Sequence, residues 1–125
     1  MPKTILIVDD EEMVVDMTRR KLVHEGYLAI GVSDGHEGLK VLREGPVDLI
    51  ILDIEMPNMN GYAFLTESRK IAGAEKVPVI MLTAYESMEP TFRRLGVADY
   101  LTKPLRFGDL ISKIQGVLEY SDAQK

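Results

Sequence analysis

Four separate points along the sequence carry polar side chains directly after short apolar runs: Asp9-Asp10, Asp53, Thr83 and Lys103. Two or three carboxylates gathered on one rim would repel each other unless a cation neutralised them. Mg²⁺ meets that need because it accepts one or two carboxylates, keeps several waters and engages phosphate. A lysine ammonium and a threonine hydroxyl opposite such an ion suit a phosphoryl group, as counter-charge and hydrogen-bond donor. The residue types therefore predict a Mg²⁺-dependent phosphoryl site.

Each of these residues also has a purely structural interpretation. Asp9-Asp10 can act as an N-capping cluster, Thr83 as an ordinary strand-end cap and Lys103 as a solvated cation. His24 and His36 stand alone in the sequence, and we interpret both as surface residues rather than metal ligands. The functional interpretation depends on all four polar points meeting at one edge of a sheet.

The apolar runs before the polar residues have the character of strands. The run at residues 49–52 is unbroken and rich in β-preferring residues, which is typical of a strand covered on both faces. Similar runs predict further strands at residues 5–8, 28–32, 77–82 and 98–101. Ligands of open parallel sheets bind at the carboxyl ends of the strands. Asp53 is therefore placed where chemistry is usually done.

Amphipathic stretches between these strands predict helices. Acidic residues suit the start of the first helix, Gly26 and Gly73 are stop signals for the first and third, and Gly61 opens the third. We expect the polar residues 121–125 to be frayed. The expected apolar stripes are Val14, Met17, Thr18 and Leu22; Leu39 and Leu42; Phe64, Leu65, Ile71 and Ala72; and Phe107, Leu110, Ile111, Ile114, Val117 and Leu118. Alternating strands and helices predict an α/β fold, a doubly wound five-stranded parallel sheet with helices on both faces.

Composition sets the limits on class and location. The 125 residues suit one domain, and 46% hydrophobic and 28% charged residues describe an ordinary soluble globule. A net charge of −5 without a basic stripe argues against direct nucleic-acid binding. The absence of cysteine rules out disulfides and thiolate metal sites. No stretch approaches the ~20 apolar residues that cross a bilayer, so we expect a cytoplasmic protein without a membrane partner.

The polar residues and their neighbours also resemble a known family. Asp9-Asp10, the run Asp53-Ile54-Glu55-Met56-Pro57 with Gly61, Thr83-Ala84 and Lys103-Pro104 look like the response-regulator receiver domain of two-component signalling. The resemblance covers nearly the whole chain, so residues 1–125 are expected to form a single receiver domain and to carry no DNA-binding or catalytic output domain themselves. Such a chain is either a stand-alone regulator or a piece of a longer protein. It implies a flavodoxin-like fold with strand order 2-1-3-4-5, as in chemotaxis regulators.

The resemblance implies a phosphoacceptor and a metal site. Asp53 would accept a phosphoryl group from a histidine kinase or a phosphotransfer protein. Asp10, Asp53 and the backbone carbonyl of Glu55 would ligate Mg²⁺, with Asp9 acting through water. The domain would then change its binding face toward a downstream protein.

The resemblance also implies the switch residues. Thr83 would hydrogen-bond the phosphoryl group, and Lys103 would hold its oxygens. Tyr100 matches the aromatic switch position that turns inward when Thr83 moves, although by periodicity alone a tyrosine on a strand is a packing residue. We also predict that the Lys103-Pro104 peptide bond is cis.

The function implied is a phosphorylation-switched signalling module with at most weak self-phosphorylation and self-dephosphorylation, not a metabolic enzyme. One alternative is a Mg²⁺-dependent phosphohydrolase with an aspartate nucleophile. That enzyme typically needs Asp-x-Asp on one loop, whereas Asp53 is followed by Ile54-Glu55 and a proline. A second alternative, a flavin-binding module, needs a hydroxyl- and glycine-rich phosphate loop after the first strand, where Asp9-Asp10 would repel a phosphate.

Two features depart from the family pattern. The segment at residues 83–103 is shorter than usual by about half a helical turn and contains Pro90. We therefore expect a short and mobile fourth helix, which Ser87 would cap and Gly96 would close in a left-handed conformation.

The second departure concerns the residues two positions after Asp53 and Thr83, which are Glu55 and Tyr85. A negative charge and a bulky ring beside the site should hinder the approach of water. We expect both residues to slow loss of the phosphoryl group without changing the identity of the site.

Overall fold

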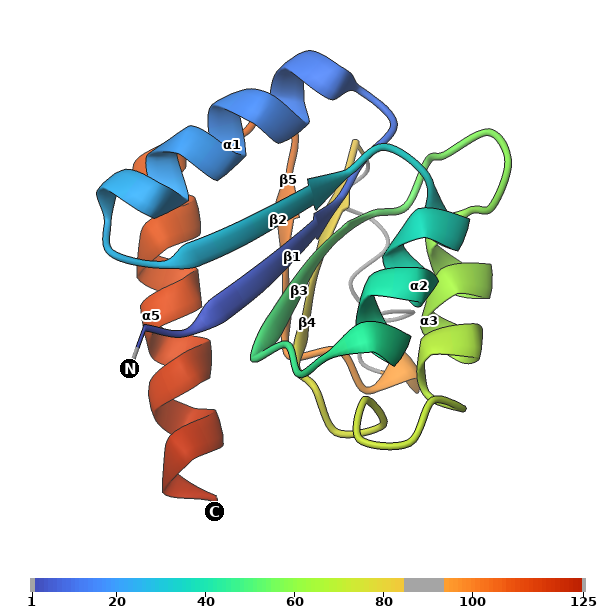
Figure 1. The fold of residues 1–125 in the computed structure, drawn as a ribbon. Coiled ribbons are helices and arrows are strands. Elements are labelled where there is room, and N and C mark those ends of the chain that lie inside the picture. Colours follow the sequence, from blue (N-terminus) through green and yellow to red (C-terminus); the bar gives the residue numbers. More distant parts are fainter. Residues whose placement is uncertain (1, 85–93, 125) are drawn as a thin grey trace.

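The computed structural model describes residues 2–84 and 94–124, and within them the sheet has five parallel strands in the order β2-β1-β3-β4-β5 (Figure 1). The order confirms the predicted fold class. The strands are β1 (Thr4–Val8), β2 (Leu28–Val32), β3 (Leu49–Asp53), β4 (Val79–Thr83) and β5 (Asp99–Thr102). The helices that lie wholly within the described ranges are α1 (Glu12–His24), α2 (Gly35–Glu44), α3 (Gly61–Ser68) and α5 (Phe107–Ala123).

The sheet separates two apolar cores because successive side chains of a strand point to opposite faces. In Figure 1, α1 and α5 lie on one side of the sheet and α2 and α3 on the other. Leu6, Val8, Ile50, Leu52, Val79 and Met81 face α2 and α3, where Phe64 is fully buried. Ile5, Ile7, Leu49, Ile51, Ile80 and Leu82 face α1 and α5. All five residues of β3 are buried, which confirms a strand covered on both faces.

The pairing register aligns the carboxyl ends of β1, β3, β4 and β5. Val8 pairs with Leu52, Asp53 pairs with Leu82, and Thr83 pairs with Thr102. The residues that follow β1, β3, β4 and β5 are therefore delivered to one edge of the sheet. This alignment is what brings the polar points of the sequence together.

Two helices differ from the expectation. In α1 the buried residues are Val15, Thr18 and Leu22, whereas the predicted Met17 is 52% exposed. The helix is thus rotated so that Val15, not Val14, faces the sheet. Helix α3 ends at Ser68, well before Gly73.

Local hydrogen bonds surround the end of α3. The Ser68 hydroxyl donates to the carbonyl of Leu65 at 2.9 Å, and a turn follows in which Ile71 N–H bonds to the Ser68 carbonyl. Ile71 is consequently half-buried outside the helix, and Ala72 is exposed.

The ends of two other segments can be compared with the prediction. Helix α5 continues through Ala123 instead of fraying at residue 121, and Lys3 forms an ion pair with Asp122 at 2.8 Å. Gly96 has a φ of 72°, which confirms its left-handed conformation. The expected helix over Ser87 and Pro90 lies outside the described residues, and so does its mobility.

Candidate functional site

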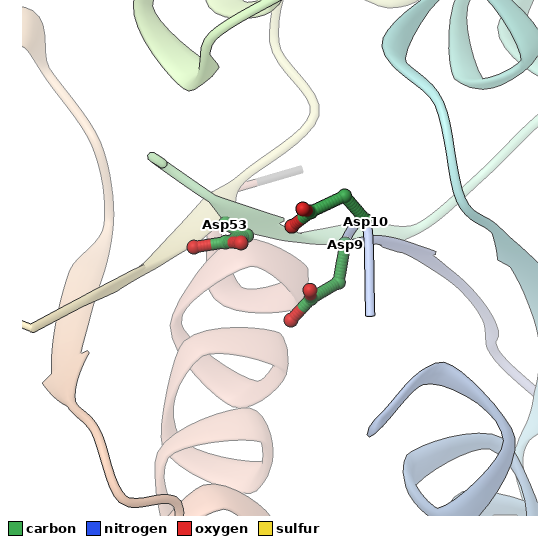
Figure 2. A group of neighbouring side chains, drawn as sticks. All are labelled: Asp9, Asp10 and Asp53. Carbon is green, nitrogen blue, oxygen red and sulfur yellow. The ribbon is translucent and has the colours of Figure 1, made fainter. Parts of the chain in front are cut away.

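Three carboxylates meet where β1 and β3 end. Figure 2 shows Asp9 and Asp10 following β1 and Asp53 at the end of β3, with the Asp10 carboxylate turned toward Asp53. One oxygen from each carboxylate lies within 4.8 Å of those of the other two. Asp9 and Asp53 are fully buried, whereas Asp10 is partly exposed. The sequence-predicted acid cluster therefore exists, with two of its members out of contact with solvent.

The backbone fixes Asp9 and Asp53 in this position. The N–H of Asp9 bonds to the Val32 carbonyl at 3.3 Å, which continues the β1–β2 pairing by one residue. The Oδ1 atom of Asp9 accepts the N–H of Glu11 at 3.0 Å and so turns the chain into α1. On the other strand, the N–H of Ile54 bonds to the Leu82 carbonyl at 3.1 Å, which holds Asp53 beside β4.

Gly61 is required where the loop after β3 returns to Asp53. A Cβ atom at this position would lie 2.8 Å from the Cα of Ile54 and 2.9 Å from the Asp53 carbonyl oxygen. Helix α3 then begins at Gly61, and the Asn60 side chain caps it by accepting the N–H of Ala63 at 2.9 Å. The glycine therefore lets the start of α3 pack against the strand end that carries the candidate phosphoacceptor.

Lys103 joins the cluster from the end of β5. Its Nζ atom lies 3.0 Å from Asp53 Oδ1, 3.8 Å from Asp9 Oδ2 and 3.7 Å from Glu11 Oε1. Its backbone N–H bonds to the Thr83 carbonyl at 2.7 Å. The Lys103-Pro104 peptide bond is cis, as the sequence analysis predicted. The solvated interpretation of Lys103 is therefore wrong.

The charges of the cluster perturb each other. Burial, and then the negative charge of Asp9, raise the pKa of Asp53 to about 7, although Lys103 acts in the opposite direction. Burial likewise raises the pKa of Asp9. Burial alone would lower the pKa of Lys103, but its hydrogen bond to Asp53 and the surrounding carboxylates outweigh burial and raise that pKa. The single positive charge of Lys103 is thus too little to neutralise the buried carboxylates of Asp9 and Asp53.

The oxygen atoms of this cluster fit a hard divalent cation. The Oδ2 atoms of Asp9 and Asp53 are buried and have no hydrogen-bond partner within residues 2–84 and 94–124. Buried carboxylate oxygens without partners are costly, and a cation with oxygen ligands would satisfy them. The partly exposed Asp10 would add a third oxygen beside solvent, which suits an ion that keeps bound waters.

Thr83 lies at the end of β4 and is fully buried. Its hydroxyl donates to Glu55 Oε1 at 3.4 Å, and the N–H of Ala84 donates to the same oxygen at 3.3 Å. Sequence reasoning missed this side-chain contact and assigned only the carbonyl and the charge of Glu55 a role. The available signal was the strand order, because a residue two positions after β3 must pass beside the end of β4.

The remaining switch and tuning residues are placed differently. Tyr100 is half-buried and packs against the core that faces α2 and α3, so its packing interpretation holds in this conformation. Tyr85 lies outside the described residues. His24 and His36 are both exposed, in agreement with their interpretation as surface residues.

With this geometry in place, comparison with known proteins identifies the class. The chain matches the model of the response regulator receiver domain family over residues 5–115. It therefore belongs to that family, which consists of phosphorylation-switched signalling modules of two-component systems. Membership favours this function over the phosphohydrolase. Within the described residues no helix is both long and apolar enough to cross a membrane.

Three similar proteins illustrate the match. A probable transcriptional regulator, ycf27, of Cyanidium caldarium is 38% identical over 116 residues, which are 91% of this chain and 45% of that protein. The CheY-like receiver domain of Methanospirillum hungatei is 31% identical with a TM-score of 0.91, and the alignment covers 100% of both chains. The response regulator TrrA of Thermotoga maritima, solved in complex with Mg²⁺-BeF, is 34% identical with a TM-score of 0.80, over 92% of this chain and 98% of that one.

The curated relatives are longer than this chain. The chain spans about half the length of the curated relatives it matches, for example 45% of the Cyanidium protein and 53% of the Escherichia coli regulator HprR. The shared part is the receiver domain.

Proposed function

We propose that Asp53 is the phosphoacceptor of this receiver domain. The observation that carries the proposal is the position of the Asp53 carboxylate. It is buried beside Asp9 and Asp10, and its Oδ1 atom lies 3.0 Å from the Lys103 Nζ atom. Asp9 is buried as well, but its Oδ2 atom lies 3.8 Å from the Lys103 ammonium, farther than Asp53 Oδ1. Asp53 is therefore the carboxylate of the cluster that lies closest to the Lys103 ammonium, which can then bind the oxygens of the transferred phosphoryl group.

The proposed metal ligands are Asp10, Asp53 and the backbone carbonyl of Glu55, with Asp9 acting through a water. Mg²⁺ bound there would neutralise the acid cluster and the charge on a transferring phosphoryl group. The N–H of Glu55 donates to Asp53 Oδ1 at 3.3 Å, and together with Lys103 it fixes the orientation of the carboxylate.

The reaction would form one bond and break another. An Asp53 carboxylate oxygen attacks the phosphorus of the donor, and the bond between phosphorus and the leaving group breaks with its electron pair on the leaving group. Lys103 holds the phosphoryl oxygens, because its ammonium remains charged beside the carboxylates. The Thr83 hydroxyl donates a hydrogen bond to the phosphoryl group, and Tyr100 turns inward in response.

The proposed partners follow from this role. A histidine kinase or a phosphotransfer protein supplies the phosphoryl group, and a downstream protein binds the altered face. The protein acts in the cytoplasm as a single receiver domain over residues 1–125, without direct nucleic-acid or membrane binding. Its chemistry is limited to weak self-phosphorylation and self-dephosphorylation.

The test is incubation with acetyl phosphate and Mg²⁺, followed by intact mass and peptide mapping. We expect one labile acyl phosphate on Asp53, which Asp53→Asn abolishes. The matched control is Asp109→Asn, which removes an exposed carboxylate in the first turn of α5. A phosphoryl group mapped to another residue would contradict the proposal. Steady release of phosphate without an accumulated phosphoprotein would favour the phosphohydrolase. Bound flavin, with no phosphoprotein and no phosphate release, would favour the flavin module.

A further inference from the structure

The Glu55 carboxylate engages the Thr83 hydroxyl, which the proposed function assigns to the phosphoryl group, and the adjacent Ala84 N–H. One oxygen, Oε1, accepts both the Thr83 hydroxyl at 3.4 Å and the Ala84 N–H at 3.3 Å. Both donors lie at the end of β4, whereas Glu55 belongs to the loop after β3. The side chain therefore links the two strand ends on either side of the site.

These two contacts cannot coexist with a phosphoryl group bound to the same donors. A threonine hydroxyl and a backbone N–H each donate a single hydrogen bond, so each serves either Glu55 or a phosphoryl oxygen. A carboxylate and a phosphoryl group at this distance would also repel each other. Hydrogen bonds of 3.3–3.4 Å are long and therefore easy to exchange. Phosphorylation must consequently displace Glu55.

Tyr62, the second residue of α3, offers a donor to which Glu55 can move. Its hydroxyl is buried and finds no hydrogen-bond partner among the residues that the structure describes. Burial, and then the negative charge of Glu55, raise the pKa of Tyr62, so the two side chains interact electrostatically. A buried hydroxyl without a partner is costly, and a hydrogen bond to a carboxylate would remove that cost.

We propose that Glu55 is a latch: its carboxylate holds Thr83 and Ala84 in the unphosphorylated protein, and it moves to the Tyr62 hydroxyl when a phosphoryl group takes those donors. The latch rests on the proposed function, because it assumes that the phosphoryl group is placed on Asp53. Glu55 is a positioning residue in this scheme, since it acts through Thr83 and Ala84. It stabilises the unswitched state and raises the energetic threshold for switching.

The first test needs no phosphoryl group. In the unphosphorylated protein, Glu55→Ala should shift the NMR resonance of the Ala84 amide proton upfield, because its acceptor is lost. Glu55→Gln keeps an uncharged acceptor and should give an intermediate shift. Glu11→Gln removes another exposed carboxylate of the same rim, one that lies 3.7 Å from Lys103, and should leave the Ala84 resonance in place. An Ala84 amide that does not respond to Glu55→Ala overturns the latch.

The second test measures the competition with beryllofluoride and Mg²⁺ as the phosphoryl analogue. Glu55→Ala should bind the analogue roughly 3- to 10-fold more tightly than the parent, the range expected for releasing two weak hydrogen bonds. Glu11→Gln should gain less than about twofold, because the Glu11 side chain is exposed and solvent screens its 3.7 Å contact with Lys103. Equal gains in the two variants would reduce the effect to charge and refute the latch.

The Tyr62 part has its own readout. In the beryllofluoride complex, Tyr62→Phe should weaken analogue binding relative to the parent and should have no such effect in the Glu55→Ala background. An equal effect in both backgrounds would contradict the transfer of Glu55 to Tyr62. If the parent fails to bind beryllofluoride, the proposed function is wrong. The Ala84 amide resonance in the unphosphorylated protein still tests whether Glu55 accepts its hydrogen bond.

Discussion

Replacing Asp53 by asparagine should stabilise the metal-free protein at neutral and alkaline pH. Asparagine keeps the shape of the side chain and an oxygen that can accept from Lys103, but it carries no charge. The parent carboxylate is fully buried beside the equally buried Asp9, and it competes with Asp9 for one lysine. Removal of this charge relieves both the burial penalty and the repulsion.

The magnitude follows from the pKa of Asp53, which burial and the charge of Asp9 raise from 3.8 to about 7. In the unfolded chain the carboxyl loses its proton near its ordinary pKa, whereas the folded protein retains it until about pH 7. Folding stability therefore falls as the pH rises from about 4 to about 7 and is level above that. A shift of about 3 units corresponds to a loss of about 4 kcal/mol, an upper bound for what Asp53→Asn can recover.

Thermal unfolding in the presence of a chelator is the direct assay. At pH 8 we expect Asp53→Asn to be more stable by about 2–4 kcal/mol, or by roughly 4 °C of Tm per kcal/mol for a domain of this size. Near pH 4 the difference should be much smaller, because the Asp53 carboxyl is then protonated in the folded parent and still about half protonated in the unfolded chain. The control Asp109→Asn, on the exposed face of α5, should stay within about 0.5 kcal/mol of the parent at each pH.

Addition of Mg²⁺ should reverse the ranking in part. A ligand that binds only the folded protein stabilises it by about 2.7 kcal/mol when present at 100 times its Kd. The parent should gain this stability, and Asp53→Asn should gain much less. A stability difference that is the same at pH 4 and pH 8, or a variant less stable than the parent in metal-free buffer at pH 8, would refute the reasoning.

Three further predictions test the metal ligands and the loop that supports them. Asp10→Ala should weaken Mg²⁺ binding by at least about tenfold in a calorimetric titration, and unchanged affinity would remove Asp10 from the ligand set. Gly61→Ala should cost roughly 1–3 kcal/mol in denaturant unfolding, because the new Cβ meets backbone at 2.8 Å; Gly108→Ala, whose Cβ meets nothing within 4 Å, should not destabilise the protein, and equal costs would contradict the steric argument. Asn60→Ala should cost about 1 kcal/mol by the same measurement through loss of its 2.9 Å cap on α3, and no loss would show that the cap is dispensable.

Local sequence patterns were enough to predict the strands and the polar residues that follow them. Unbroken apolar runs such as residues 49–52 predict strands that are buried on both faces. Parallel strands then place their carboxyl ends at one edge of the sheet. The approach of Asp53 and Lys103 was predictable for this reason. The order 2-1-3-4-5 was not contained in any single run, and it came from the family resemblance.

Which side chains are buried, and which neighbours they contact, depends on how the helices and strands pack together. Val15 rather than Val14 faces the sheet in α1 and Met17 stays in solvent, because the rotation of a helix is set by the surface against which it packs. Likewise, Asp9 and Asp10 are adjacent residues of the same type, yet Asp9 is fully buried and Asp10 is partly exposed.

The contact between Glu55 and Thr83 shows the same limit most clearly. The two residues are 28 positions apart, and their meeting depends on β3 and β4 being neighbours in register. Local sequence carries propensities for strands, helices and turns, but it does not carry the distance between two side chains from different strands. That distance is fixed only when the sheet assembles and both cores are packed against it.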